Sequence, residues 1–132
     1  MKKSRKAIAL MMLVLLMTGS WTLVNAASRL ERTVGGVDIV ASSVAGSNMA
    51  TGSTYCKVQD NSVSCSVEGD YGAAHLITYA SYTDSKSQTQ PSSATIGFVA
   101  PSGYQTLSVQ CHHSVSAYGE TWTGDTSQTY PH

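Results

Sequence analysis

Residues 104–122 read YQTLSVQCHHSVSAYGETW, and no other part of the chain alternates apolar and polar side chains for so long. Because successive side chains of a β-strand point to opposite faces, the pattern predicts one long strand that turns into another. The apolar row contains Leu107, Val109, Cys111, His113, Val115 and Ala117. The polar row contains Ser108, Gln110, His112, Ser114, Ser116 and Tyr118. Gly119-Glu120 is typical of a two-residue hairpin turn, which pairs Ala117 with Trp122 and places Trp122 on the apolar face.

The chain begins with a basic segment, MKKSRK, followed by the apolar run AIALMMLVLLM. These are the first two regions of a secretory signal peptide, and Val24-Asn25-Ala26 has the small residues that a signal peptidase recognises. We therefore predict a signal peptide over residues 1–26, cleaved after Ala26 or Ala27, and a secreted, extracellular product. The alternative is a retained anchor, but the apolar run is shorter than the ~20 residues that span a bilayer, so we expect no stable membrane insertion after cleavage.

Removal of the signal peptide changes the charge of the chain. The whole chain carries eight basic and eight acidic residues, whereas residues 27–132 keep four basic and all eight acidic residues, a formal charge of −4. Such a surface has no basic track for phosphates, which argues against nucleic acid and anionic membranes as partners.

The remaining chain is the size of one domain, is rich in Ser and Thr, and has no apolar stripe with helical period. We predict an all-β fold, a small antiparallel β-sandwich of six or seven short strands, with a small closed barrel as the alternative. Residues 27–54 are predicted as a Gly/Ala/Ser-rich arm with one strand at 37–40, and residues 55–132 as the core domain. Strands are expected at 75–83 and 94–100, with a polar loop over 84–93.

Residues 55–67 predict a hairpin around an Asp60-Asn61 turn, in which Cys56 faces Cys65 across the two strands. This pairing predicts a Cys56–Cys65 disulfide and leaves Cys111 as a buried free thiol. A bond from Cys111 to Cys56 or Cys65, joining the two sheets, remains open as the competing connectivity.

The sequence Cys111-His112-His113, with His75, raises a metal-binding alternative. Adjacent strand residues point to opposite faces, so His112 and His113 do not readily chelate one ion together. Cys111 and His113 share a face and would form a ligand pair if His75 and a carboxylate approached them. We assign no metal and no cofactor. The chain also lacks a Gly-x-Ser-x-Gly or His-Glu-x-x-His motif, which argues against an enzyme.

The polar row predicts the candidate binding residues, namely Gln110, His112, Ser114, Ser116 and Tyr118. Their hydroxyl, amide, imidazole and phenol groups suit hydrogen bonding to a glycan or a protein, so the leading hypothesis is a secreted, non-enzymatic binding protein. An ordinary solvated sheet face is the alternative interpretation.

A Sec signal followed by a small β-sandwich with histidines and Ser/Thr-rich strands resembles the bacteriocins of the lactococcin 972 type. This resemblance implies an antibacterial function as an alternative. No motif matches residue by residue, so it assigns no site.

Overall fold

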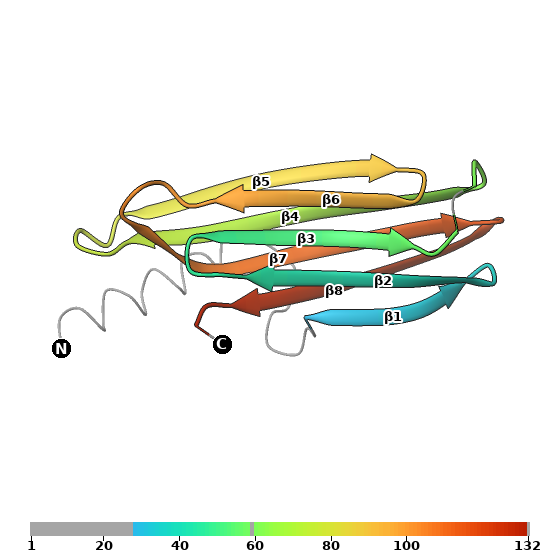
Figure 1. The fold of residues 1–132 in the computed structure, drawn as a ribbon, viewed down its shortest axis with the longest axis horizontal. Helices are drawn as coiled ribbons and strands as arrows, with labels where there is room; N and C mark the ends of the chain where they lie inside the picture. Colours follow the sequence, from blue (N-terminus) through green and yellow to red (C-terminus); the bar gives the residue numbers. More distant parts are fainter. Residues whose placement is uncertain (1–27, 59, 132) are drawn as a thin grey trace.

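The computed structural model describes residues 28–58 and 60–131, and the predicted signal peptide lies outside them. The described residues form eight β-strands (Figure 1). The strands are β1 (Arg29–Val34), β2 (Val37–Ala45), β3 (Met49–Cys56), β4 (Val63–His75), β5 (Ser81–Gln90), β6 (Ser93–Val99), β7 (Tyr104–Ala117) and β8 (Glu120–Thr129). Among these residues there is no helix long and apolar enough to cross a membrane.

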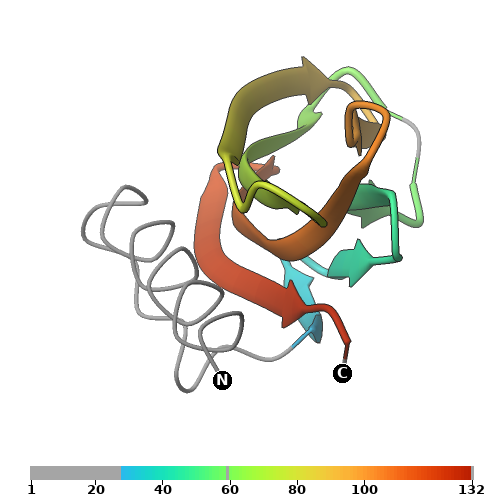
Figure 2. The same cartoon turned by 90° about the vertical axis from the view of Figure 1, so that its left-hand side faces the viewer.

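The strands form two antiparallel sheets that pack face to face, as the end-on view shows (Figure 2). Sheet A has the order β1-β2-β3-β6 and sheet B the order β5-β4-β7-β8. The predicted all-β sandwich is therefore confirmed, with eight strands in place of six or seven. The closed-barrel alternative is wrong, because no hydrogen-bonded strand pair joins the two sheets.

Residues 29–54, most of the predicted arm, provide three of the four strands of sheet A. The sequence predicted only one strand there because most of the side chains that β2 and β3 bury beyond Ile39 are small. They include Ala41, Ser43, Ala45, Ala50 and Thr54. Small residues let the two sheets approach closely, but they give a weak hydrophobic alternation in the sequence.

The predicted hairpin between Cys56 and Cys65 is wrong, although the predicted disulfide is present. Cys56 lies in sheet A opposite Ile39, whereas Cys65 lies in sheet B opposite Val115. The disulfide therefore joins the sheets, and its Cα atoms are 7.1 Å apart. Because the loop that it closes is short, we expect it to stabilise the fold by less than ~3 kcal/mol.

The residues between β4 and β6 also differ from the prediction. β4 continues to His75, residues 76–80 turn, and β5 occupies most of the segment predicted as a loop. In β5, every residue is exposed or half-buried. An edge strand with polar residues on both faces shows no alternation, so its sequence resembles that of a loop.

The hairpin of β7 and β8 is present, but its turn is shifted by one residue. Tyr118 and Gly119 are the two turn residues, with φ of 50° and 84°, so Ala117 pairs with Glu120 and Trp122 with Val115. The shift moves the pairing by two residues, which keeps Trp122 on the inner face as predicted. Its indole is partly buried and lies over Gly124.

Candidate functional site

The outer face of sheet B carries mainly serine and threonine side chains across all four of its strands. The strand register places Val63, Cys65 and Val67 of β4 toward the core, so the residues between them and their cross-strand partners point outward. We call this surface the hydroxyl face. Its residues are Ser81, Thr83, Ser85, Ser87 and Thr89 of β5, Ser64, Ser66, Glu68, Asp70 and Gly72 of β4, Ser108, Gln110, His112, Ser114 and Ser116 of β7, and Thr121, Thr123, Asp125, Ser127 and Thr129 of β8. Three of these residues, Ser108, Gln110 and Ser127, are buried.

The only ionisable side chains of the hydroxyl face lie in its middle. Glu68, His112 and Asp125 are directly opposite one another on β4, β7 and β8, and Asp70 lies in the next row. His112 Nδ1 is 2.6 Å from Asp125 Oδ1, and both side chains are partly exposed. The Asp125 carboxylate therefore orients the imidazole. The row of Glu68, His112 and Asp125 is flanked on the sheet by serine and threonine side chains.

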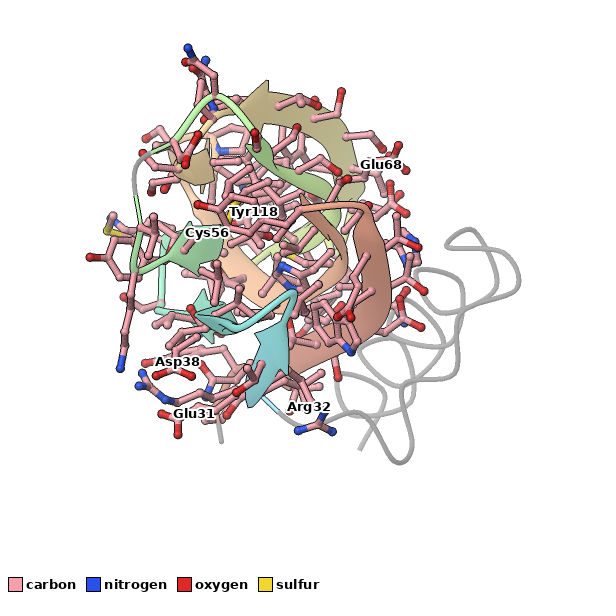
Figure 3. The ribbon with its side chains drawn as sticks, turned by 90° about the vertical axis from the view of Figure 1, so that its right-hand side faces the viewer. Glu31, Arg32, Asp38, Cys56, Glu68 and Tyr118 are labelled. Carbon is pink, nitrogen blue, oxygen red and sulfur yellow. A yellow bond between two sulfur atoms is a disulfide. The ribbon has the colours of Figure 1, made fainter. Side chains whose placement is uncertain are left out.

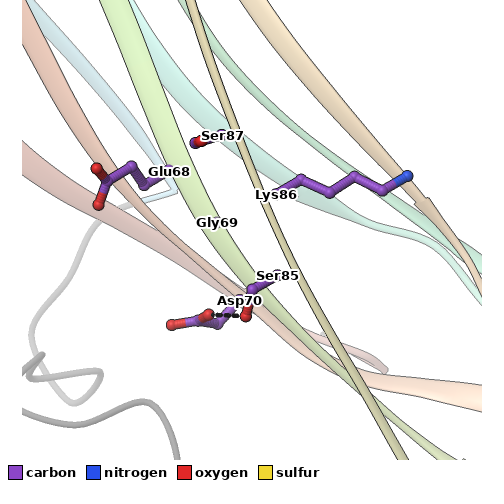
Figure 4. Close-up of a pocket in the computed structure, with 6 residues that line it drawn as sticks. All are labelled: Glu68, Gly69, Asp70, Ser85, Lys86 and Ser87. Atoms are coloured by element: carbon purple, nitrogen blue, oxygen red, sulfur yellow. Dashed lines mark hydrogen bonds between the residues drawn. The ribbon is translucent and has the colours of Figure 1, made fainter.

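A shallow hollow of about 260 Å³ lies between β4 and β5 at this row (Figure 4). Its lining consists of Glu68, Gly69, Asp70, Ser85, Lys86 and Ser87. Ser85 Oγ donates a hydrogen bond of 2.5 Å to Asp70 Oδ1. The ammonium group of Lys86 points away from the hollow toward β6, where it donates to the carbonyl of Gly97 at 2.7 Å. Carboxylates and hydroxyls therefore dominate the hollow.

Charge is unevenly distributed between the two sheets. Arg29, Arg32 and Lys57 are all near sheet A, where Arg29 forms an ion pair with Glu31 at 2.8 Å. Figure 3 places Glu68 on a different side of the sandwich from Glu31, Arg32 and Asp38. The hydroxyl face consequently contains no lysine or arginine and carries the negative charge of Glu68, Asp70 and Asp125.

The structure brings only part of the predicted binding row together on an open surface. His112, Ser114 and Ser116 are partly or fully exposed on the hydroxyl face. Gln110 is on the same face but only 2% exposed, and its amide has no hydrogen-bond partner among the described residues. Tyr118 lies in the turn, where its hydroxyl donates to the Asp60 carboxylate at 2.6 Å. That bond lowers the pKa of Asp60 and raises the pKa of Tyr118.

Sequence reasoning missed Glu68, Asp70, Ser85 and Ser87 as members of this surface. The signal for the first two was present, because Ser64, Ser66, Glu68 and Asp70 alternate with the buried residues of β4. For β5 no such signal exists, since neither of its faces is fully buried.

A second polar group lies in the core, around His113. The hydroxyl of Thr54 donates to the Ser66 carbonyl at 2.8 Å, so its oxygen accepts from His113 Nδ1–H at 2.7 Å. The other ring nitrogen, Nε2, then accepts from the Thr126 hydroxyl at 2.6 Å, and Thr126 accepts from Ser43. The hydrogen bonds thus assign a neutral imidazole with its proton on Nδ1.

Burial affects the chemistry of this inner group. It lowers the pKa of His113 to about 4, with a smaller contribution from His112, and raises the pKa of the Cys111 thiol to about 11. Cys111 and His113 are both fully buried. Neither side chain is exposed to a substrate in this conformation. The hydrogen bonds between Thr54 and His113 and between Ser43 and Thr126 instead join the two sheets.

The structure does not assemble the metal site considered from the sequence. Cys111 and His113 share the inner face, but His75 lies opposite Tyr104 at the start of β7. His75 Nδ1 accepts hydrogen bonds from the backbone of Ile77 and Thr78. Within residues 28–58 and 60–131, no group of three or more His, Cys, Asp or Glu side chains is placed to hold a metal ion.

No protein-family model matches the chain, and no curated protein or solved structure matches it either.

Proposed function

We propose that this protein is a secreted, non-catalytic binding protein whose hydroxyl face binds an extracellular or cell-surface glycan. The observation that carries the proposal is the hollow beside Glu68 and Asp70, set in a sheet face on which hydroxyl side chains are the most frequent. Carboxylates accept hydrogen bonds from sugar hydroxyls, and serine and threonine hydroxyls both donate and accept them. The hydroxyl groups of a sugar can donate to these carboxylates and can both donate to and accept from these serines and threonines.

The charge of this face narrows the class of glycan. Glu68, Asp70 and Asp125 are close together with no lysine or arginine among the residues of the face. An anionic polysaccharide would be repelled, whereas neutral sugars or sugars with an amino group would be accepted. The face also lacks aromatic residues, so hydrogen bonds rather than ring stacking would supply the affinity.

Rigidity supports the same proposal. β4 and β7 are the two central strands of sheet B, and their inner side chains are packed in the core. Side chains that project from such strands keep their spacing without a ligand, which reduces the ordering cost of binding. His112, Ser114 and Ser116 remain members of the proposed binding face, while Tyr118 lies at its end.

The test is a binding screen of the purified protein against neutral, amino-sugar and anionic polysaccharides, followed by isothermal titration with the best ligand. Glu68→Gln and Asp70→Asn keep the size of each side chain and remove its charge. Each should weaken binding about tenfold or more, because a hydrogen bond to a charged group contributes roughly 1.5–3 kcal/mol. Their melting temperatures should stay close to that of the parent, because Glu68 is exposed and Asp70 only half-buried.

Asp38→Asn is the matched control, because Asp38 is an exposed carboxylate on the outer face of sheet A. It should bind as the parent does. Equal binding by all three variants, or preference for an anionic polysaccharide, would contradict the proposal.

A further inference from the structure

The edge of sheet B at β5 differs from the neighbouring edge of sheet A at β6. The two edge strands run along the same side of the sandwich (Figures 1 and 2). β5 side chains cover the edge of β6: Gln88 Oε1 accepts from the Thr95 backbone N–H at 2.7 Å, and Lys86 Nζ donates to the Gly97 carbonyl at 2.7 Å. Lys86 Nζ also lies 5.5 Å from the centre of the Phe98 ring. The β6 edge is therefore closed to another strand.

The edge of β5 itself is open. The backbone N–H of Ser85 donates to its neighbour's carboxylate, Asp84 Oδ1, at 2.9 Å. This N–H therefore points away from β4, and the alternation of a strand directs the N–H and C=O groups of Thr83 and Ser87 the same way. No hydrogen bond from the described part of the chain reaches those outward groups of Thr83 or Ser87. The ten residues of β5 contain no proline.

We infer that the β5 edge binds the β5 edge of a second copy of this chain, in an antiparallel pair about a two-fold axis at Ser85. The outward groups of Ser85 then pair with those of Ser85 in the other copy, and those of Thr83 pair with those of Ser87. This arrangement satisfies the outward backbone groups of Thr83 and Ser87, which a single chain leaves to water, and it replaces the contact of the Ser85 N–H with Asp84.

The charges of β5 favour this register. With Ser85 opposite itself, Asp84 of each copy lies opposite Lys86 of the other, which forms two cross-strand ion pairs. With the axis moved to Asp84, two carboxylates would face each other, and with the axis at Lys86, two ammonium groups would. Both alternatives oppose like charges, which is destabilising.

The contacts made within one chain are compatible with this pair. Lys86 Nζ has three protons and uses one for the Gly97 carbonyl, so it can also hold a carboxylate of the second copy. Asp84, which covers the Ser85 N–H in the single chain, exchanges that contact for Lys86 of the other copy. The same aspartate thus protects the edge before pairing and forms the ion pair after it.

The pair joins the two copies of sheet B into one continuous sheet. Ser85 and Ser87 line the hollow at the edge, so the two hollows adjoin across the interface. If the hollow binds a repeating glycan, which rests on the proposed function, the dimer engages it at two points and gains avidity. The dimer itself does not depend on any ligand.

Cysteine cross-linking tests the register. In the paired sheet the two Ser85 Cα atoms would be about 5.5 Å apart, within the range of a disulfide. Ser87 lies on the same face, but its copy would be four residues away along the pair, roughly 13 Å distant. Ser85→Cys should therefore form a covalent dimer under mild oxidation, several-fold faster than Ser87→Cys. Cys111 is buried and Cys56 and Cys65 are bonded, so the native cysteines should not interfere.

Variants that exchange the charges of Asp84 and Lys86 test the ion pairs. Their dimerisation is measured by sedimentation velocity over a range of protein concentrations. The parent should dimerise, and Asp84→Lys and Lys86→Asp should each raise the dissociation constant at least about tenfold, since each opposes like charges. The double variant D84K/K86D restores opposite charges and should recover the dimer. A merely structural effect of either substitution would not be reversed by the second one.

Three results would each overturn the inference. They are a parent protein that stays monomeric at its highest soluble concentration, a Ser85→Cys variant that cross-links no faster than Ser87→Cys, and a double charge variant that remains monomeric while the parent dimerises. Circular dichroism of every variant confirms that it is folded before it is compared.

Discussion

At the scale of single residues, His113 is the side chain whose environment has the clearest physical consequence. It is fully buried, and its neutral form donates to Thr54 and accepts from Thr126. Other titratable side chains on the inner face of sheet B include Cys111, Tyr71, Asp84 and Lys86, whereas His112 and Asp125 lie on the opposite face. Protonation would place a positive charge in the core, which burial opposes.

We predict that the protein loses stability as the pH falls through the range in which the unfolded chain protonates His113. The pKa of His113 is about 4 in the fold against 6.5 for an ordinary histidine, so the unfolded state takes up the proton first. The contribution is complete above pH 6.5, is lost as the pH falls, and levels off below about 4. The loss should reach about 3 kcal/mol, measured by urea unfolding at a series of pH values.

His113→Asn is the matched variant for this measurement, because the amide of asparagine can still donate to Thr54. It should be less stable than the parent at neutral pH but should show a flatter dependence between pH 6.5 and 4. An identical pH dependence in both proteins would assign the loss of stability to other groups.

At the scale of strands, the two sheets are in close contact around Cys111, where glycines of both sheets face its sulfur. A Cβ atom at Gly52 of β3 would lie 2.3 Å from Cys111 Sγ of β7, and one at Gly69 of β4 would lie 3.3 Å from the same sulfur. The thiol therefore fills the space left by two glycines, one in each sheet. This contact explains the buried position of Cys111 without any chemical role for its sulfur.

We predict that Gly52→Ala destabilises the fold by roughly 1–3 kcal/mol, because the added methyl group overpacks the core. Gly97→Ala in β6 is the control, since a Cβ there would meet nothing within 4 Å. It should leave stability unchanged or slightly increased. Thermal and urea unfolding of both variants measure the difference.

The double variant G52A/C111A identifies the cause. Removal of the sulfur makes room for the new methyl group, so the double variant should lose less stability than the sum of the two single losses. Strictly additive losses would show that Gly52 is required for another reason.

At the scale of the whole molecule, the strand topology has a consequence for export. β1 begins at Arg29, and the Ser28 carbonyl accepts a hydrogen bond from the Ser43 backbone N–H. Cleavage after Ala26 or Ala27 therefore leaves in place the contacts that β1 makes with the other described residues. The Cys56–Cys65 disulfide that joins the sheets also suits an oxidising compartment.

We predict that the exported protein begins at Ala27 or Ser28. Intact-mass measurement of the secreted material should give the mass of one of these two products, with one disulfide and one free thiol. A secreted protein that still carries residues 1–26 would contradict the predicted signal peptide.

Much of the fold was predictable from segments in which apolar and polar residues alternate without interruption. The long β7 strand, the β6 strand near Ile96 and Phe98 and the inward position of Trp122 follow from local pattern, and the structure has each of them. The Cys56–Cys65 disulfide was also predicted, but from a hairpin that the structure does not contain. The hydroxyl row of β7 was also visible in the sequence. Its partners on β4 and β5 were not assigned. Strands that are far apart in the sequence pair without any sequence pattern of fixed spacing that would identify the partner.

The sequence by itself determined the all-β class and the polar and apolar faces of β7, because both depend on a two-residue period. Only the tertiary structure decided that Cys56 and Cys65 join different sheets, that residues 29–54 belong to the sandwich, and that Glu68 lies opposite His112. The physical reason is that small inner side chains and a polar edge strand carry little hydrophobic signal. Their positions are set by the packing of the two sheets against each other.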